Sequence, residues 1–312
     1  MSLLVVLWGG AFVAIKILLR DVSAETIAFL RFVLTTLGLL AVMAIVRPER
    51  IPIQPRDRGK ILLLGFMAVF VYHLALNIGE RFVSANVASL IIASMPVMVA
   101  IASHLALGEA ITPTKAGGIA LALAGVVVLA LFGTPGAHLE VRGVVGTLTV
   151  AIAPAAWAVY TIMGKPLVPK YGALRLTTIA MATGTVLLAP VAIGPTIADL
   201  GALTPSDWGW LAFLAFGCSV YGYTVWLYAL RALDASQVAV WVYLIPVAAL
   251  VWAAVVLAEP VTMFLLLGGA MVLGGVVLTE RVAPRAAARR DAEVVAIFNE
   301  PAGTRGGSPD DP

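Results

Sequence analysis

The sequence of 312 residues is 61% hydrophobic and only 12% charged, and its mean hydropathy is +1.02. Soluble globular domains carry about a quarter charged residues, so this composition excludes an ordinary water-soluble fold and favours a protein buried in lipid. The formal net charge of +3 does not indicate a nucleic-acid partner, because the 20 Lys and Arg residues lie between apolar runs.

Ten apolar segments are long enough to cross a bilayer as helices. A helix rises about 1.5 Å per residue, so roughly 20 apolar residues cross a hydrocarbon core of about 30 Å. Proline-containing breaks such as Thr112-Pro113 and Glu259-Pro260 support the boundaries. The predicted spans are 3–20, 24–46, 60–81, 84–107, 113–132, 142–164, 174–194, 207–230, 235–257 and 260–280.

The two ends of the chain are expected to differ in structure. The first span lacks a basic leader and a cleavage site, so it is expected to be a retained helix. Residues 284–312 have no periodic apolar pattern and are expected to form a disordered cytoplasmic tail. Cys218, the single cysteine, lies in an apolar run and is expected to serve only packing.

The distribution of basic residues predicts the orientation. The loops after spans 2, 4, 6 and 8, together with the tail, hold most of the 20 Lys and Arg residues. Cytoplasmic loops retain positive charge. The sequence therefore predicts a multi-pass protein of the cell inner membrane with both termini in the cytoplasm.

An internal repeat divides the chain into two halves of five spans. Residues 85–128 align without a gap with residues 235–278, and Pro96 then falls on Pro246. Glu109 likewise falls on Glu259, and Trp8 and Lys16 fall on Trp157 and Lys165. Because five is an odd number, the second copy enters the membrane upside down. The expected fold is an all-α membrane protein of ten transmembrane helices, built from inverted five-helix repeats at 1–133 and 142–281.

These residues resemble the ten-helix drug/metabolite transporters with two EamA domains, over about 1–281. The motifs that carry the resemblance are Leu7-Trp8-Gly9-Gly10-Ala11-Phe12, Ala28-Phe29-Leu30-Arg31-Phe32, Leu107-Gly108-Glu109-Ala110-Ile111-Thr112-Pro113, Ala229-Leu230-Arg231, Ile245-Pro246 and Ala258-Glu259-Pro260. The resemblance implies a cavity between the halves, lined mainly by spans 1, 3, 4, 6, 8 and 9, with spans 5 and 10 peripheral. It also implies export as the commoner direction. Spans 1 and 6 contain no acid, so the cation–proton exchange of the single-domain multidrug members is not implied.

Polar side chains inside spans 3 and 4 are candidate contacts for a transported molecule, because polar groups at membrane depth usually face a bundle interior or a wet cavity. His73 and Asn77 share one helix face, and so do Asn86 and Ser89. His73 could bind cargo or respond to pH. The alternative is that these groups form only interhelical hydrogen bonds.

Aromatic residues are concentrated in spans 6, 8 and 9, and Trp8 adds one in span 1. They are read as cavity lining rather than as interfacial belts, because several lie far inside their spans. The candidates for substrate binding in this group are Trp8, Trp157, Tyr160, Tyr223, Trp226, Trp241 and Tyr243, with Gln237 beside them.

Two prolines and one arginine are unusual inside membrane spans and are further candidates for the site. Pro96 and Pro246 each remove a helix hydrogen bond, which either exposes backbone groups to cargo or produces a packed kink. Arg31 is the basic residue deepest within a span. It either pairs with a carboxylate or phosphate of the cargo or makes a structural contact.

Inverted repeats around one site give two near-equivalent arrangements, one open on each side of the membrane. The sequence therefore predicts a secondary transporter that exports small polar metabolites by alternating access, with amino acids suggested by the resemblance. A channel or a non-transporting membrane scaffold is the alternative. An enzyme is not expected, because no HExxH, no G-x-S-x-G and no pair of intramembrane acids is present. No cofactor and no metal are expected, the partners are a small-molecule substrate and the lipid bilayer, and monomer and homodimer are equally compatible with the sequence.

Overall fold

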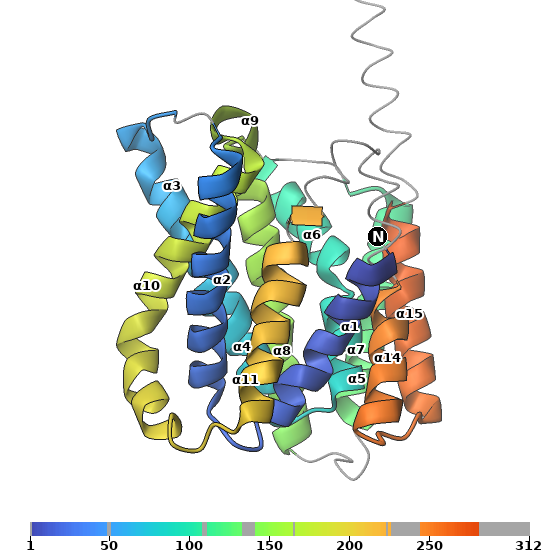
Figure 1. Ribbon diagram of the computed structural model, residues 1–312. Coiled ribbons are helices and arrows are strands. Elements are labelled where there is room, and N and C mark those ends of the chain that lie inside the picture. Colours follow the sequence, from blue (N-terminus) through green and yellow to red (C-terminus); the bar gives the residue numbers. More distant parts are fainter. Residues whose placement is uncertain are drawn as a thin grey trace, which may run out of the picture.

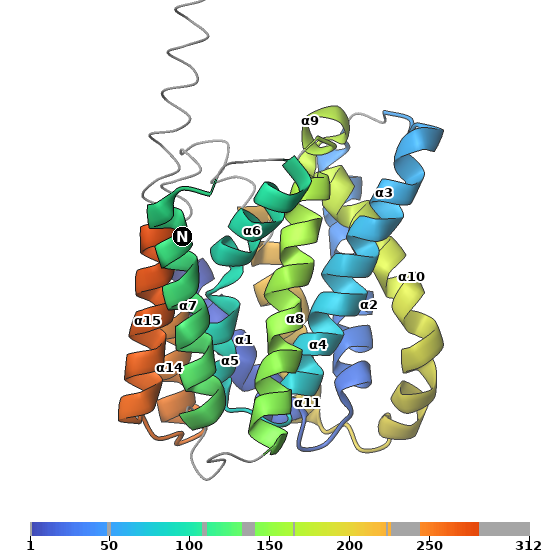
Figure 2. The same ribbon diagram turned by 180° about the vertical axis from the view of Figure 1, so that it is seen from behind.

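The computed structural model describes residues 2–48, 51–107, 111–132, 141–164, 166–222, 224–225 and 244–280, and in these ranges the regular structure is helical. Each of the ten predicted spans contains helix there, arranged as an upright bundle (Figures 1 and 2). Five helices of 22 to 27 residues are long and apolar enough to cross a bilayer, and shorter apolar helices accompany them. The chain is a multi-pass integral membrane protein of the all-α class, as predicted.

The helices of the first half correspond closely to the predicted spans 1 to 5. Span 3 starts earlier than predicted, because Pro55 is favourable in the first turn of a helix. The first-half elements are α1 (Ser2–Leu18), α2 (Ala24–Val46), α3 (Pro55–Gly65), the π-helix η1 (Phe66–Val71), α4 (Tyr72–Gly79), α5 (Ala85–Ile92), α6 (Met95–Leu107) and α7 (Pro113–Phe132).

The second half repeats this series. Its span 7 continues to Asp199, past Pro190 and Pro195, rather than ending near residue 194. The second-half elements are α8 (Val141–Gly164), α9 (Val168–Tyr171), α10 (Ala173–Asp199), α11 (Pro205–Ala212), the π-helix η2 (Phe213–Tyr221), α14 (Ile245–Val256) and α15 (Met263–Glu280).

The two halves share their irregularities as well as their helices. The starts of α6 and α14, at Met95 and Ile245, are equivalent in the sequence repeat. Each of spans 3 and 8 contains a π-helical segment, η1 and η2. The α1 helix starts at the edge that carries the N mark, whereas α8 starts at the opposite edge (Figures 1 and 2). The repeats are therefore inverted in space, as the odd number of spans predicts.

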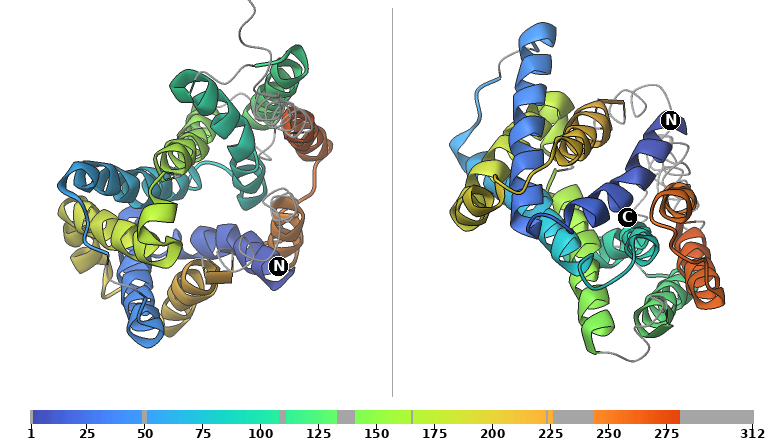
Figure 3. Two further views of the ribbon diagram at one scale, coloured as in Figure 1. Left: turned by 90° about the horizontal axis from the view of Figure 1, so that it is seen from above. Right: turned by 60° about the horizontal axis from the view of Figure 1, so that its bottom comes forward.

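Spans 5 and 10 stand together at one side of the bundle. The helices α7 and α15 pack closely (Figure 3), because their glycines let the backbones approach. A Cβ atom added at Gly125 would lie 2.8 Å from the carbonyl oxygen of Gly268. This pair forms a peripheral unit, as the family resemblance implies.

A polar clamp joins the halves at the edge where α3 begins. The Asp57 carboxylate accepts hydrogen bonds from the Tyr171 hydroxyl at 2.7 Å and from the Lys170 ammonium group. Lys170 also donates to the Gln54 side chain at 2.6 Å. The hydrogen bond that the Lys170 ammonium donates to Asp57 raises the pKa of the Lys170 amine. A lysine with a raised pKa stabilises the folded state below its ordinary pKa and loses that contribution as the pH rises through the raised value.

The first prediction concerns this clamp. Asp57→Asn is expected to lower the melting temperature at neutral pH, because the Lys170 ammonium loses its charged partner. The difference from the unmodified protein should shrink in strong alkali, where Lys170 itself loses its proton. Thermal unfolding in detergent at both pH values measures this effect. Lys60→Gln, an exposed change on the same helix, is the control, and a pH-independent loss in Asp57→Asn would contradict the prediction.

Candidate functional site

A cavity of about 400 Å³ lies between the two halves. Within the described part of the chain its walls come from α1, α2, α4, α5, α6, α8, η2 and α14, so spans 1, 2, 3, 4, 6, 8 and 9 contribute and α7 and α15 do not. Most lining groups are apolar, with a few polar side chains among them. A site of this size and character suits one small organic molecule.

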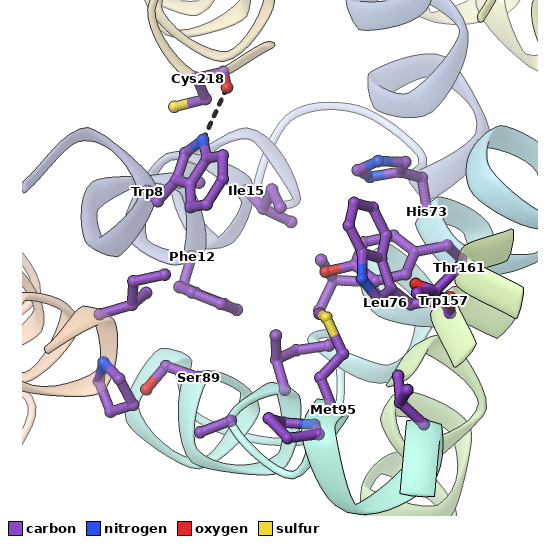
Figure 4. Close-up of a pocket in the computed structure, with 18 of the residues that line it drawn as sticks. Trp8, Phe12, Ile15, His73, Leu76, Ser89, Met95, Trp157, Thr161 and Cys218 are labelled. Carbon is purple, nitrogen blue, oxygen red and sulfur yellow. Dashed lines mark hydrogen bonds between the residues drawn. The ribbon is translucent and has the colours of Figure 1, made fainter. Parts of the chain in front are cut away.

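Aromatic and polar side chains face one another across this cavity (Figure 4). Trp8, Phe12 and Ile15 project from α1, and His73 and Trp157 lie opposite them. The Trp8 indole donates a hydrogen bond to the Cys218 carbonyl at 2.8 Å, which fixes the ring against η2. The cavity wall is therefore held by contacts between the first and second repeats.

Arg31 brings the positive charge to this site. It is 6% exposed, lines the cavity, and directs Nε and Nη2 to the Ser219 hydroxyl, each at 3.2 Å. Its guanidinium also lies 5.5 Å from the centre of the Phe32 ring. Among the described residues, the ion pair is the one between Lys170 and Asp57. Arg31 therefore has no carboxylate partner in that part of the chain. The side chain is held inside the bundle rather than reaching toward the membrane surface.

His73 is enclosed in an aromatic group on the opposite wall. Its ring centre lies 4.5 Å from that of Phe32 and 4.7 Å from that of Tyr72, and Tyr72 contacts Trp157 at 5.8 Å. Nδ1 of His73 is buried and has no hydrogen-bond partner within the described ranges. The His73 side chain also lines the cavity, so its ring can contact a molecule that enters there.

Two helix breaks border the cavity. Span 4 is interrupted at Ala93 and Ser94, so α5 and α6 are separate helices rather than the single helix expected over 84–107. The Ser94 hydroxyl turns back to the Ile91 carbonyl at 2.6 Å, and Pro96 follows in the first turn of α6. Pro246 occupies the equivalent place in α14 and also lines the cavity. The prolines therefore mark helix starts at the site.

Several predicted site residues do not line the cavity. Asn77 is fully buried and donates to the Ala24 carbonyl at 3.1 Å, so it joins α4 to α2. Asn86 is buried at the start of α5, where its backbone amide bonds to Glu259. Tyr160, on α8, packs against two apolar clusters of the core. Helical spacing predicts that Asn77 shares a face with His73, and that Asn86 shares a face with Ser89. In the bundle, neighbouring helices cover the asparagine end of each face, whereas His73 and Ser89 line the cavity.

The other predicted residues divide into two groups. Those that line the cavity are Trp8, Arg31, His73, Ser89, Pro96, Trp157 and Pro246. Those outside the described residues are Tyr223, Trp226, Gln237, Trp241 and Tyr243.

Cavity residues missed by the sequence include Tyr72, Met95, Thr161 and Cys218. Cys218 was expected only to pack, and it does donate its thiol to the Leu7 carbonyl at 3.2 Å, yet its side chain also faces the cavity. The register change in η2 rotates this face of span 8, and no residue pattern indicated that π-helix.

The second prediction tests the Trp8 contact. Trp8→Phe keeps an aromatic wall but leaves the Cys218 carbonyl without its indole donor. The loss of about 1 kcal/mol should raise the KM of transport roughly fivefold. Uptake kinetics in proteoliposomes measure it. Trp208→Phe, an exposed tryptophan near the start of α11, is the control, and an unchanged KM in Trp8→Phe would contradict the prediction.

Comparison with known proteins agrees with this architecture. The model of the EamA-like transporter family matches residues 1–131 and again 144–281. The chain belongs to this family. The two matches cover both halves of the repeat and nearly all the described helices.

Curated relatives span almost the whole chain. An uncharacterized transporter from Archaeoglobus fulgidus is 36% identical over 281 residues, which are 90% of this chain and 97% of that protein. A probable terminal-alkyne amino-acid exporter from Streptantibioticus cattleyicolor is 32% identical over 89% of this chain and 91% of its own. A probable amino-acid metabolite efflux pump from Escherichia coli is 28% identical over 88% of this chain and 91% of its own.

A solved crystal structure shares the fold. It matches with a TM-score of 0.62 at 20% sequence identity, over 91% of this chain and 96% of the other. The EamA-type transporter is thus a membrane protein whose homologues are named transporters, as the sequence predicted.

Proposed function

We propose that this EamA-type transporter is a secondary carrier that exports small polar metabolites, with amino acids as the class, by alternating access. The observation that carries the proposal is the cavity between the repeats, in which the charged Arg31 side chain faces largely apolar walls. An aqueous pore would instead need a polar lining through the membrane.

Arg31 provides the chemical reason for a carboxylate-bearing cargo. Arg31 has no carboxylate partner among the described residues. A buried guanidinium left in that condition is costly, and a substrate carboxylate would form charge-assisted hydrogen bonds with it. The opposite wall offers the rings of His73, Tyr72 and Trp157 for the rest of the molecule. The names of the relatives from S. cattleyicolor and E. coli support both an amino-acid class and the outward direction.

The position of the cavity supports an inward-facing state. Its lining residues include Thr161 near the end of α8 and Ile245 at the start of α14. Those helix ends lie toward the edge with the N mark, where the basic loops also lie (Figure 1). We take this edge as cytoplasmic, which puts both termini in the cytoplasm of a cell with the protein in its inner membrane. The repeats at 1–133 and 142–281 are then the units that rearrange to open the other side.

Counterflow distinguishes this carrier from a channel or a scaffold. Proteoliposomes loaded with a mixture of unlabelled amino acids should take up labelled amino acids saturably, because a carrier exchanges cargo across the membrane. Ohmic single-channel currents would contradict the carrier mechanism. Folded protein that exchanged no tested amino acid would contradict the substrate class.

A further inference from the structure

A second cavity lies at the edge opposite the basic loops. Its volume is about 330 Å³, and the exposed residues Arg20 and Arg81 form part of its wall. Lys16, Glu80 and Glu259 lie deeper in it. Ile15 and Leu76, which line the central cavity, are one residue before Lys16 and one helical turn before Glu80. The lining residues of the two cavities are therefore adjacent along α1 and about one turn apart along α4.

Glu80 is the unusual group in this cavity. Its side chain is 0% exposed, and neither carboxylate oxygen has a hydrogen-bond partner among the residues that the structure describes. Burying an ionised carboxylate without hydrogen bonds costs several kcal/mol, so such a group is stable mainly in the protonated form. Glu80 thus has the chemistry of a proton-binding residue.

The neighbouring charges are already engaged by backbone groups. The Lys16 ammonium donates to the Glu80 carbonyl and to the Val83 carbonyl, the latter at 2.7 Å. The Glu259 carboxylate accepts from the amides of Ala85 and Asn86, at 3.1 and 3.3 Å. These contacts close the turn between α4 and α5 from both repeats and leave the Glu80 side chain free to exchange a proton.

We propose that Glu80 binds the proton whose movement drives export through the central cavity. This inference rests on the proposed function of an alternating-access carrier. Glu80 takes a proton from the outer aqueous phase when the turn between α4 and α5 opens and cargo leaves to the outside. It releases the proton to the cytoplasmic side in the inward-facing state, when the next cargo molecule binds. One carboxylate becomes a carboxylic acid and is regenerated in each cycle, so the charge and the proton balance without another reactant.

Other charged groups act on Glu80 from the helices around it. They are Lys16 of α1, Arg31 of α2 and Glu259 before α15. Arg20 and Arg81 line the same cavity, and Arg142 lies near the start of α8, which packs against α4. The positive charges favour the ionised form of Glu80, whereas Glu259 favours its protonated form. These opposing effects allow Glu80 to release a proton as well as to bind one.

Glu80→Gln tests the proposal, because it keeps the size of the side chain and removes its ability to exchange a proton. Proteoliposomes would be assayed with labelled amino acids for exchange without a gradient and for accumulation driven by a pH gradient. Glu80→Gln should retain exchange and lose accumulation. Asp21→Asn, an exposed acid in the turn after α1, is the matched control. It should retain both exchange and accumulation, because Asp21 is not among the residues that line the second cavity.

Each result has a defined meaning. Absence of exchange in the unmodified protein would overturn both the proposed function and the coupling role. Exchange with unchanged accumulation in Glu80→Gln would overturn the coupling role alone, as would loss of accumulation in His73→Gln but not in Glu80→Gln. Loss of exchange in a folded Glu80→Gln variant would likewise overturn it, since it would assign Glu80 to cargo movement itself.

A labelling experiment on the unmodified protein does not depend on any variant folding. Dicyclohexylcarbodiimide reacts with protonated carboxyl groups in apolar surroundings. Mass spectrometry should find the label on Glu80, with more label as the pH falls and less on Glu259. Labelling of Glu259 without Glu80 across the same pH range would overturn the proposal.

Discussion

Arg31→Gln is expected to abolish transport of amino acids at ordinary concentrations. The guanidinium lines the cavity, and among the described residues it donates side-chain hydrogen bonds to the Ser219 hydroxyl, which is neutral. A hydrogen bond to a charged group contributes about 1.5–3 kcal/mol, so loss of a carboxylate contact should raise KM about 100-fold at the upper limit. Arg31→Lys should also impair transport, because an ammonium group does not reproduce the planar fork of the guanidinium.

Two comparisons separate cargo binding from a structural effect of this variant. Ser219→Ala removes the hydroxyl that orients Arg31 but keeps its charge, so it should raise KM much less. Amines that lack a carboxylate should have the same inhibition constant in the unmodified protein and in Arg31→Gln, when labelled cargo is supplied near the KM of each protein. If Arg31→Gln transports amino acids with an unchanged KM while remaining folded, the carboxylate contact does not exist.

The sequence predicted the architecture because the features that determine it are local or repeated. Apolar length determines where a chain can cross a bilayer, and matched residues such as Pro96 and Pro246 show which segments are equivalent. The structure places these prolines in the first turn of equivalent helices at the cavity. The sequence repeat alone therefore indicates which two helix starts border the candidate site.

The residues that were misplaced depend on packing between helices. Helical spacing put His73 and Asn77 on one face, yet Asn77 bonds to the start of α2 while His73 lines the cavity. A face of one helix does not specify which neighbour covers each turn of it. The π-helix η2 adds a local change in register, which brings Cys218 to the cavity although its surroundings in the sequence are simply apolar.

Gly184→Ala is expected to cause the largest loss of stability among single methyl additions in α10. A Cβ atom at Gly184 would lie 2.6 Å from the Cβ of Val69 and would also meet the carbonyl oxygen of Gly65. The opposing glycine is equally constrained, since a Cβ atom at Gly65 would lie 2.7 Å from the Gly184 nitrogen. Backbone atoms cannot rotate away as a side chain can, so α10 must separate from span 3.

Overpacking of this kind costs about 1–3 kcal/mol, and the backbone contact puts Gly184→Ala at the upper end. Gly194→Ala is the matched control on the same helix, because nothing lies within 4 Å of a Cβ atom there. Gly194→Ala should leave the free energy of unfolding unchanged or raise it by about 0.5–1 kcal/mol, because alanine forms helix more readily than glycine. Thermal unfolding in detergent compares the two variants directly. Equal melting temperatures would mean that α10 and span 3 are not packed backbone to backbone, and the tight attachment of α10 to the first repeat would be wrong.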